Sequence, residues 1–168
     1  ISFGSNIEAS GGVVGVWRHA NARVRGMKRV QVEPHLSVTG ACSAQWVPIK
    51  PKTDAAFLYA LIHVMLHEAR REQLDLPHLA HHTSSPYLVG AHGYYLRDRA
   101  TKKPLVWDEA AGRAALHDAP GIREALSASV QVDAVEIGAD GDVLADGLLE
   151  GQTAFDKLVA HMAPYSPE

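Results

Sequence analysis

Three short polar stretches in the first third of this chain of 168 residues contain the residue types that bind nucleotides. They are Gly4-Ser5-Asn6, Glu33-Pro34-His35 and Thr53-Asp54. Their amide, hydroxyl and carboxylate groups form the hydrogen bonds that phosphates, ribose hydroxyls and bases require. If the fold brings these stretches together, they form a nucleotide-binding site.

The first stretch opens a loop of small residues that runs from Gly4 to Gly12 and leads into an apolar helical pattern. The free N–H groups and the dipole at the start of a helix suit a phosphate. The loop lacks the G-x-G-x-x-G pattern of dinucleotide-binding folds, and Ser10 as a helix N-cap explains the same residues. Glu33 lies about 20 residues beyond Gly12, where such folds place an acid on ribose hydroxyls. A surface glutamate at a strand end is the alternative interpretation.

Asp54 follows two prolines and opens the next helical pattern. A carboxylate in a first helical turn interacts favourably with the helix dipole. It can also accept two parallel hydrogen bonds from a ring N–H and an amino group, and guanine presents that pair through N1 and N2. Adenine does not offer this edge. Both interpretations of Asp54 remain open from the residues alone.

The elements that would position these stretches alternate between strands and helices. Short apolar runs predict strands at residues 1–3, 28–33 and 46–49. Apolar residues at helical spacing predict helices at 13–25 and 54–71. Strands that alternate with helices favour a parallel sheet, and ligands bind such sheets outside the carboxyl ends of the strands. The predicted fold class is therefore α/β, a Rossmann-like parallel sheet with flanking helices.

The second half of the chain has a different pattern. Residues 87–96 and 104–108 read as extended segments around a polar turn, and a second hairpin is expected around the sequence Gly-Ala-Asp-Gly-Asp. A last helix is expected from Thr153 to about Ala163. We expect one domain over 1–168, made of a nucleotide-binding core (1–72), a hairpin-rich insertion (73–152) and a C-terminal helix and tail (153–168).

Composition excludes several partners and functions. The formal net charge is −3 and no long block of Lys or Arg occurs, so no nucleic-acid surface is expected. No apolar run approaches about 18 residues, so no direct membrane insertion is expected.

The single cysteine, Cys42, excludes an internal disulfide and a cluster held by cysteines of this chain, and we interpret it as a small buried residue. Because the chain starts with Ile1 as though inside a strand, we expect an excised piece of a longer protein.

The order of these motifs resembles the molybdopterin oxidoreductases of the dimethyl-sulfoxide-reductase class. The resemblance rests on "FGSNIEASGG" and "RGMKRVQVEPHLSVTGACSAQWVPIKPKTDAAFLYALIHVMLHE", and it continues more loosely through "HTSSPYLVGAHGYYLRD", "KPLVWD" and "TAFDKLVAHMAPYSPE". The last stretch is similar to the branch that includes thiosulfate and tetrathionate reductases. The chain departs from the family motifs at four positions, with Glu33-Pro34-His35 for Asp-Pro-Arg, Lys52 for Gly, Ile7 for Pro and Gln45 for Asp.

The resemblance implies a role for each stretch. Family members bind bis(molybdopterin guanine dinucleotide) with molybdenum, and this region holds one guanosine end. Asn6 and Ser5, with Gly4 beside them, would meet the pyrophosphate or nearby ribose, Glu33 the ribose and Asp54 the guanine. Pro34, His35 and Thr53 complete the same cofactor-binding motifs.

The resemblance also implies what lies outside this chain. The molybdenum ligand and any iron–sulfur cluster lie upstream in the family, so no catalytic or metal-binding residue is expected here and the isolated chain is expected to be inactive. The parent enzyme would transfer oxygen atoms or electrons to or from a small substrate. Its remaining domains and an electron-transfer subunit are the expected partners.

Two alternatives come from different classes. The first is a free-standing guanine-nucleotide-binding or regulatory module. The second is a metal-dependent hydrolase, suggested by His63 and His67 at ligand spacing beside Glu68. This pair is predicted to point to solvent or to another domain, opposite an apolar stripe that faces the sheet (Leu58, Ile62, Met65 and Ala69). We interpret His81, His82 and His92 as surface histidines.

Overall fold

The computed structural model describes residues 1–167, so only Glu168, the end of the predicted tail, lies outside the described residues. Contacts divide the chain into two compact units, Ile1–Tyr59 and the part from Ala60 onward. The boundary falls inside helix α4 (Asp54–His63), not near residue 72. The single domain expected for residues 1–168 therefore stays a prediction.

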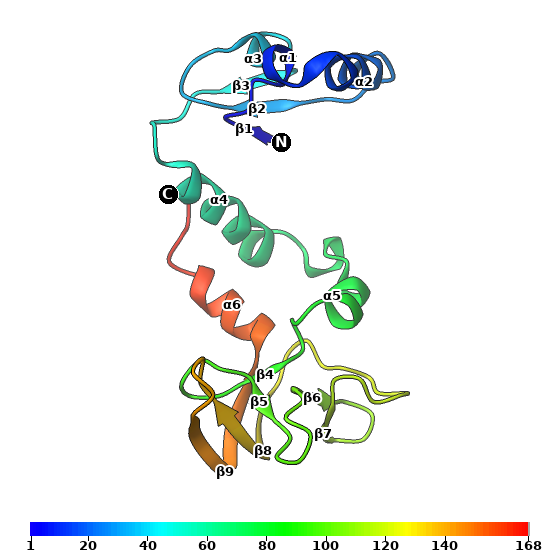
Figure 1. Ribbon diagram of the computed structural model, residues 1–168, viewed down its shortest axis with the longest axis vertical. Coiled ribbons are helices and arrows are strands. Elements are labelled where there is room, and N and C mark those ends of the chain that lie inside the picture. Colours follow the sequence, from blue (N-terminus) through cyan, green and yellow to red (C-terminus); the bar gives the residue numbers. More distant parts are fainter. Residues whose placement is uncertain (168) are drawn as a thin grey trace. The chain divides into compact units, whose positions relative to one another are not determined.

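A three-stranded parallel sheet forms the centre of the first unit (Figure 1). Its strands are β1 (Ser2–Phe3), β2 (Val30–Val32) and β3 (Gln45–Val47), and β2 lies in the middle. Both pairings are parallel, with Phe3 opposite Val32 and Val32 opposite Val47. The carboxyl ends of the strands therefore meet at one edge, and the predicted α/β class is confirmed.

Three helices accompany this sheet before α4 begins. α2 (Gly12–Val24) is the helix that the apolar spacing predicts. The one-turn helices α1 (Ile7–Ser10) and α3 (Val38–Ala41) are too short to leave a periodic pattern in the sequence. α2 contains no buried residue, and its valines Val13 and Val24 are 88% and 86% exposed.

The helix predicted for residues 54–71 ends earlier than expected. α4 passes into one π-helical turn (Val64–Glu68) and the chain then turns away, followed by a short 3₁₀ turn (Arg71–Gln73) and α5 (Leu76–His82). The apolar stripe expected to face the sheet is not buried, since Leu58 is 41% and Met65 54% exposed. That prediction is wrong for Leu58 and Met65, and the π turn shifts the helical phase only for the residues from Val64 onward.

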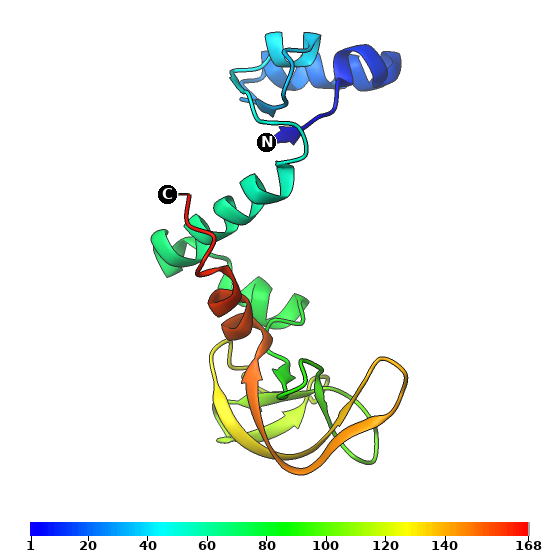
Figure 2. The same ribbon diagram turned by 90° about the vertical axis from the view of Figure 1, so that its left-hand side faces the viewer.

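Antiparallel sheets make up the rest of the second unit. One sheet has the order β4-β9-β8-β5, and a separate hairpin pairs β6 with β7. The bounds are β4 (Leu88–Val89), β5 (Leu96–Arg97), β6 (Leu105–Asp108), β7 (Arg113–Leu116), β8 (Ser129–Ile137) and β9 (Val143–Thr153). The long β8–β9 hairpin curves strongly (Figure 2) and turns at the predicted Gly-Ala-Asp-Gly-Asp sequence. The last helix, α6 (Ala154–Met162), is also confirmed, with Thr153 as its N-cap.

The core of the second unit lies between these sheets. Leucines from three different strands, Leu88, Leu96 and Leu105, pack there with Val132 and Ala134. Within residues 1–167, every helix is too short or too polar to cross a membrane.

Candidate functional site

The carboxyl edge of the parallel sheet carries the first two predicted stretches on neighbouring strands. Gly4 N–H donates to Val32 O at 3.0 Å, directly after β1. Glu33 N–H donates to Val47 O at 3.2 Å, directly after β2. The loop from Gly4 and the loop from Glu33 thus leave the sheet side by side at the same edge, as predicted.

One face of the central strand β2 is polar where it approaches this edge. Arg29, Gln31 and Glu33 alternate along it and are only 6%, 0% and 5% exposed. Gln31 Nε2 donates to Ser5 O at 3.3 Å and to Glu33 Oε2 at 3.0 Å. Gln31 Oε1 is buried and has no partner among the described residues. Buried polar atoms are nearly always hydrogen-bonded, so an unpaired buried oxygen beside the Ser5 loop is unusual.

The Glu33 carboxylate faces α3. Its Oε1 accepts from Ser37 N–H at 2.8 Å, and its Oε2 accepts from Gln31. Burial raises the pKa of Glu33, but these hydrogen bonds and the nearby His35 outweigh burial and lower the pKa overall. A Cβ at position 40 would lie 2.5 Å from Glu33 Oε1, which explains the glycine there. Pro34 and His35, the next two residues, are exposed at the rim.

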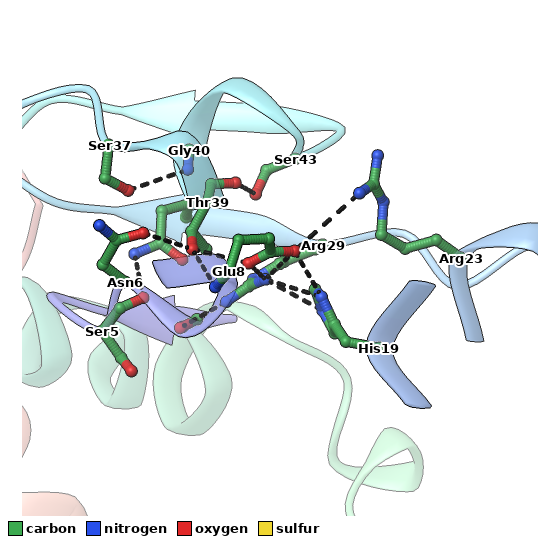
Figure 3. Close-up of polar contacts among 12 residues, drawn as sticks. Ser5, Asn6, Glu8, His19, Arg23, Arg29, Ser37, Thr39, Gly40 and Ser43 are labelled. Atoms are coloured by element: carbon green, nitrogen blue, oxygen red, sulfur yellow. Dashed lines mark hydrogen bonds and ion pairs between the residues drawn. The ribbon is translucent and has the colours of Figure 1, made fainter. Parts of the chain in front are cut away.

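A second carboxylate, Glu8 in α1, connects four elements (Figure 3). Its Oε1 lies 2.7 Å from His19 Nδ1 of α2, and its Oε2 lies 3.2 Å from Arg29 Nη1 beside β2. Its Oε2 also accepts from Thr39 Oγ1 of α3 at 2.7 Å. Burial raises the pKa of Glu8, but the hydrogen bonds from Thr39 and His19 and the charges of His19 and Arg29 outweigh burial and lower the pKa overall.

Asn6 lies on the side of this cluster away from His19 (Figure 3). Its side-chain oxygen Oδ1 accepts a hydrogen bond from Thr39 Oγ1 at 2.9 Å, and the side chain is half-buried. Gly4 has φ +57 and nothing within 4 Å of the position that a Cβ would take, so the backbone of the loop is open to a ligand. Ser5 is exposed and its carbonyl is held by Gln31.

The third predicted stretch follows β3 after a tight turn. Thr53 N–H donates to Lys50 O at 3.2 Å, with Pro51 second in the turn and Lys52 third at φ 69. Proline followed by a positive φ is the pattern of a type II turn. Asp54 then begins α4, and no described residue forms a hydrogen bond or an ion pair with its half-buried carboxylate.

Comparisons with known proteins give two relatives of this chain. The chain is 27% identical over 154 residues, 88% of its length, to the alpha subunit of chlorate reductase from Ideonella dechloratans. It is 34% identical over 68 residues, 40% of its length, to the molybdopterin-containing subunit PhsA of thiosulfate reductase from Salmonella typhimurium. No protein-family model matches the chain. The chain is homologous to part of the alpha subunits of molybdopterin oxidoreductases.

The match covers only a small part of these molybdopterin oxidoreductases. It spans 16% of the chlorate reductase subunit and 9% of the thiosulfate reductase subunit. The family resemblance found in the sequence motifs is thereby confirmed, whereas the roles of the individual residues stay predictions.

The structure explains one departure from the motifs of molybdopterin oxidoreductases. The family has glycine where this chain has Lys52, and Lys52 adopts the positive φ that glycine adopts most readily. The turn therefore has, at Lys52, the positive φ that glycine favours. At a second departure, Glu33 for Asp, the carboxylate lies against Ser37 and Gln31, so the predicted ribose contact would have to share oxygens that are already engaged.

The cluster around Glu8 was not predicted from the sequence. Its partners His19, Arg29 and Thr39 lie 11, 21 and 31 positions away along the chain. Only the fold brings them together. The one local signal is an acid in the first turn of a helix, which helix dipoles attract in any case.

The two histidines differ: His63 in α4 is buried, so the prediction that it points to solvent is wrong, whereas His67 in the π turn is exposed. His63 is buried and its Nδ1 lies 2.8 Å from Met162 O, while His67 Nε2 lies 2.9 Å from Val159 O. The two rings stack with centroids 4.6 Å apart. The last turns of α6 attract both imidazoles because their terminal carbonyls need donors. Among residues 1–167 no group of three or more His, Cys, Asp or Glu could hold a metal ion.

The remaining single residues follow their environment. Cys42 is half-buried, not fully buried as predicted, because it ends the short helix α3 beside a cavity of about 500 Å³. The side chains of His81 and His92 are 57% and 52% exposed, as expected of surface histidines. His92 contacts the buried Glu136 at 2.9 Å, and His81 contacts Glu124 at 2.7 Å.

Proposed function

We propose that this chain binds one guanosine end of bis(molybdopterin guanine dinucleotide) at the carboxyl edge of its parallel sheet. The observation that carries the proposal is the half-buried Asp54 carboxylate, which follows β3 and has no partner among the described residues. Its oxygens are not among the buried atoms without a partner, so they reach solvent and are accessible to a ligand. Guanine supplies the two parallel N–H donors that this carboxylate lacks.

The residues at the edge fit the rest of a guanosine diphosphate. Gly4 has nothing within 4 Å of the position that a Cβ would take, Ser5 is exposed, and Gln31 Oε1 is buried next to Ser5 without a partner among the described residues. Asn6 offers a half-buried amide on the neighbouring side. Because both Glu33 oxygens are engaged, we assign Glu33 to holding the loop between β2 and α3, with His35 exposed beyond it.

The role of these residues in the parent enzyme is to bind and orient. The molybdenum carried by the dinucleotide supplies the redox chemistry when the cofactor is bound. Asp54 binds the guanine, and the edge loops bind the ribose and diphosphate. These contacts, which are remote from the reaction, orient the whole dinucleotide. We assign no proton transfer and no metal ligand to this chain.

The parent enzyme is proposed to be an oxidoreductase that acts on a small oxyanion. The names of the two relatives, chlorate reductase and thiosulfate reductase, support this substrate class. The molybdenum ligand and any iron–sulfur cluster would be supplied by other parts of that enzyme, with an electron-transfer subunit as a partner.

One side of α2 is apolar and exposed, which supports a contact with other domains of the parent enzyme. Val13, Trp17 and Val24 are 88%, 64% and 86% exposed at helical spacing. Exposed apolar patches of this kind commonly mark contacts with other protein surfaces. We propose that the remaining domains of the parent enzyme cover this side of α2.

The test is cofactor content in the full-length enzyme. Asp54→Ala should lower bound guanine nucleotide and molybdenum by tenfold or so, because a charge-assisted hydrogen-bond pair is worth about 1.5–3 kcal/mol. Asp75→Ala is the control, since Asp75 only caps α5. Equal cofactor content in the Asp54 variant and the wild type would count against the proposal.

A further inference from the structure

The second unit contains a cavity of about 510 Å³ that the proposed guanosine site does not use. It lies where β4, the loop into β5, the end of β8 and the first turn of α6 meet (Figure 1). Its volume is in the range of pockets that hold small ligands, roughly 300–1,000 Å³. The side chains around it are apolar, aromatic or basic, and they include Val89, Tyr94, Tyr95, Arg97, Ile137 and Lys157.

The alternation of side chains along β4 and β5 explains how residues of both strands reach this cavity. Leu88 and Leu96 are fully buried in the core of the second unit. Successive side chains of a strand point to opposite faces, so Val89, Tyr95 and Arg97 lie on the face away from that core. Val89 and Tyr95 are also directly paired across the two segments. The cavity is therefore built on the outer face of these strands.

The first turn of α6 adds Lys157 to the cavity. Ala154 N–H donates to Tyr87 O at 2.8 Å, which holds the start of α6 against the segment before β4. Lys157 follows three residues later, so it lies on the same side of the helix as Ala154. It is half-buried, and it forms no hydrogen bond or ion pair with a described residue. Its ammonium nitrogen still reaches solvent and is accessible to a ligand.

A buried carboxylate shapes the loop between β4 and β5 that forms one wall. Glu136 is 1% exposed, and its Oε1 accepts from the backbone N–H groups of His92 at 3.0 Å and Tyr94 at 3.1 Å. A Cβ at position 90 would lie 2.4 Å from Glu136 Oε2, which explains the glycine at that position. Glu136 thus fixes the backbone at Tyr94, and its charge is used beneath the loop.

The acids next to the two basic residues are engaged as well. Asp98 accepts from the N–H and the hydroxyl of Thr101, both at 2.8 Å. Asp156 accepts from Ala128 N–H at 3.1 Å. Among the described residues, the lining of the cavity therefore has two cations and no carboxylate. A cleft lined by charges of one sign concentrates ions of the opposite sign.

We propose that this cavity binds a small organic carboxylate with an aromatic body. Arg97 uses one guanidinium N–H to donate to Lys102 O at 2.8 Å, and its other N–H groups are left for the ligand. A guanidinium donates two parallel hydrogen bonds to a carboxylate, and Lys157 adds a second positive charge. The proposal is independent of guanosine binding, since every residue around the cavity belongs to the second unit.

The rest of the lining selects an aromatic body over a bare inorganic anion. Val89 and Ile137 supply apolar surface, and Tyr94 and Tyr95 supply aromatic surface. Aromatic rings pack on one another in offset or edge-to-face arrangements, which adds to the gain from removing apolar area from water. A ligand with both a ring and a carboxylate uses the two parts of the lining together.

The test is a titration of the whole chain with benzoate, benzamide and acetate, followed by the NMR shifts of its backbone amides. Benzoate should bind in about the millimolar range expected for a ligand of this size, with shifts at residues 89–97 and 154–157. Benzamide has the same shape without the charge and should bind about tenfold more weakly, because the charge-assisted hydrogen bonds are lost. Acetate lacks the ring and should also bind about tenfold more weakly.

Variants of the two basic residues assign the contacts. Arg97→Gln and Lys157→Gln should each weaken benzoate binding about tenfold and leave benzamide binding nearly unchanged. Arg113→Gln and Lys28→Gln remove the same charges at exposed positions outside the cavity and should leave the affinity for benzoate unchanged. The amide spectrum of each variant shows at the same time whether it is folded.

The comparison of ligands on the wild type decides the proposal even if a variant does not fold. Equal affinities for benzoate and benzamide would overturn it, and so would the absence of any benzoate-dependent shift at residues 89–97 and 154–157. An equal loss of affinity in the two control variants would overturn it too, because the effect would then come from net charge.

Discussion

Lys52 is the third residue of the turn before Asp54, and its φ of 69 is costly for any residue with a Cβ. Lys52→Gly should therefore stabilise the first unit by roughly 0.5–1 kcal/mol, once the greater freedom of glycine in the unfolded chain is subtracted. Chemical denaturation followed by fluorescence of Trp17 and Trp46 measures the effect. Lys50→Gly, outside the positive-φ position, should give no gain, and equal gains for both variants would refute the explanation.

Candidate site residues could be predicted from the sequence where a local motif identifies them. Gly4-Ser5-Asn6, Glu33 and Asp54 were identified because each follows an apolar run, and the structure places the first two stretches on one sheet edge. The direction of the Glu33 carboxylate was not predictable, because it depends on Ser37 and Gln31 in the folded loop. The burial of His63 was not predictable for the same reason, since its partner Met162 O belongs to α6, 99 residues later.

At the scale of elements, Glu8 holds α1, α2, α3 and the start of β2 together through one carboxylate. The pKa of Glu8 is lowered in the folded chain, so the unfolded chain binds more protons near pH 4.5. The resulting stability is fully present above about pH 4.5 and is lost as the pH falls through the lower folded pKa. The pKa of Glu33 is also lowered, so Glu33 adds to the loss of stability as the pH falls.

Glu8→Gln should lower the stability of the first unit by about 2–4 kcal/mol at neutral pH, because it leaves the buried Arg29 without its carboxylate. It should also flatten the decline in stability between about pH 6 and about pH 3, which denaturation series at several pH values would show. Glu150→Gln on the exposed strand β9 provides a control with little effect at either pH. An unchanged pH dependence in the Glu8 variant would disprove this role.

Elements with strong local signals were predicted well. The β8–β9 hairpin has a glycine-rich turn between two apolar runs, and α6 has a threonine N-cap. The one-turn helices α1 and α3 carry no periodicity, and the early end of α4 arises from a π turn that no short pattern announces. The two short helices shape the site, so the sequence could locate the edge but not its side-chain geometry.

At the scale of the whole molecule, the exposed valines of α2 test whether this surface belongs inside a larger assembly. Val13→Lys combined with Val24→Lys should change the free energy of unfolding by no more than about 0.5 kcal/mol each, since both side chains are almost fully exposed. The same variant should reduce self-association of the chain in sedimentation experiments. Val32→Lys, at a fully buried position, should unfold the first unit and serves as the contrast. Marked loss of stability in the α2 variant would show that these valines are packed.

The most direct test of guanosine binding compares GDP with IDP, which lacks the 2-amino group, in calorimetric titrations of the wild type and Asp54→Ala. We predict that the wild type binds GDP about tenfold more tightly than IDP, and that Asp54→Ala binds the two about equally, because the charge-assisted pair to guanine is lost. Equal binding of GDP and IDP by the wild type, or an undiminished preference in the Asp54 variant, would contradict the account.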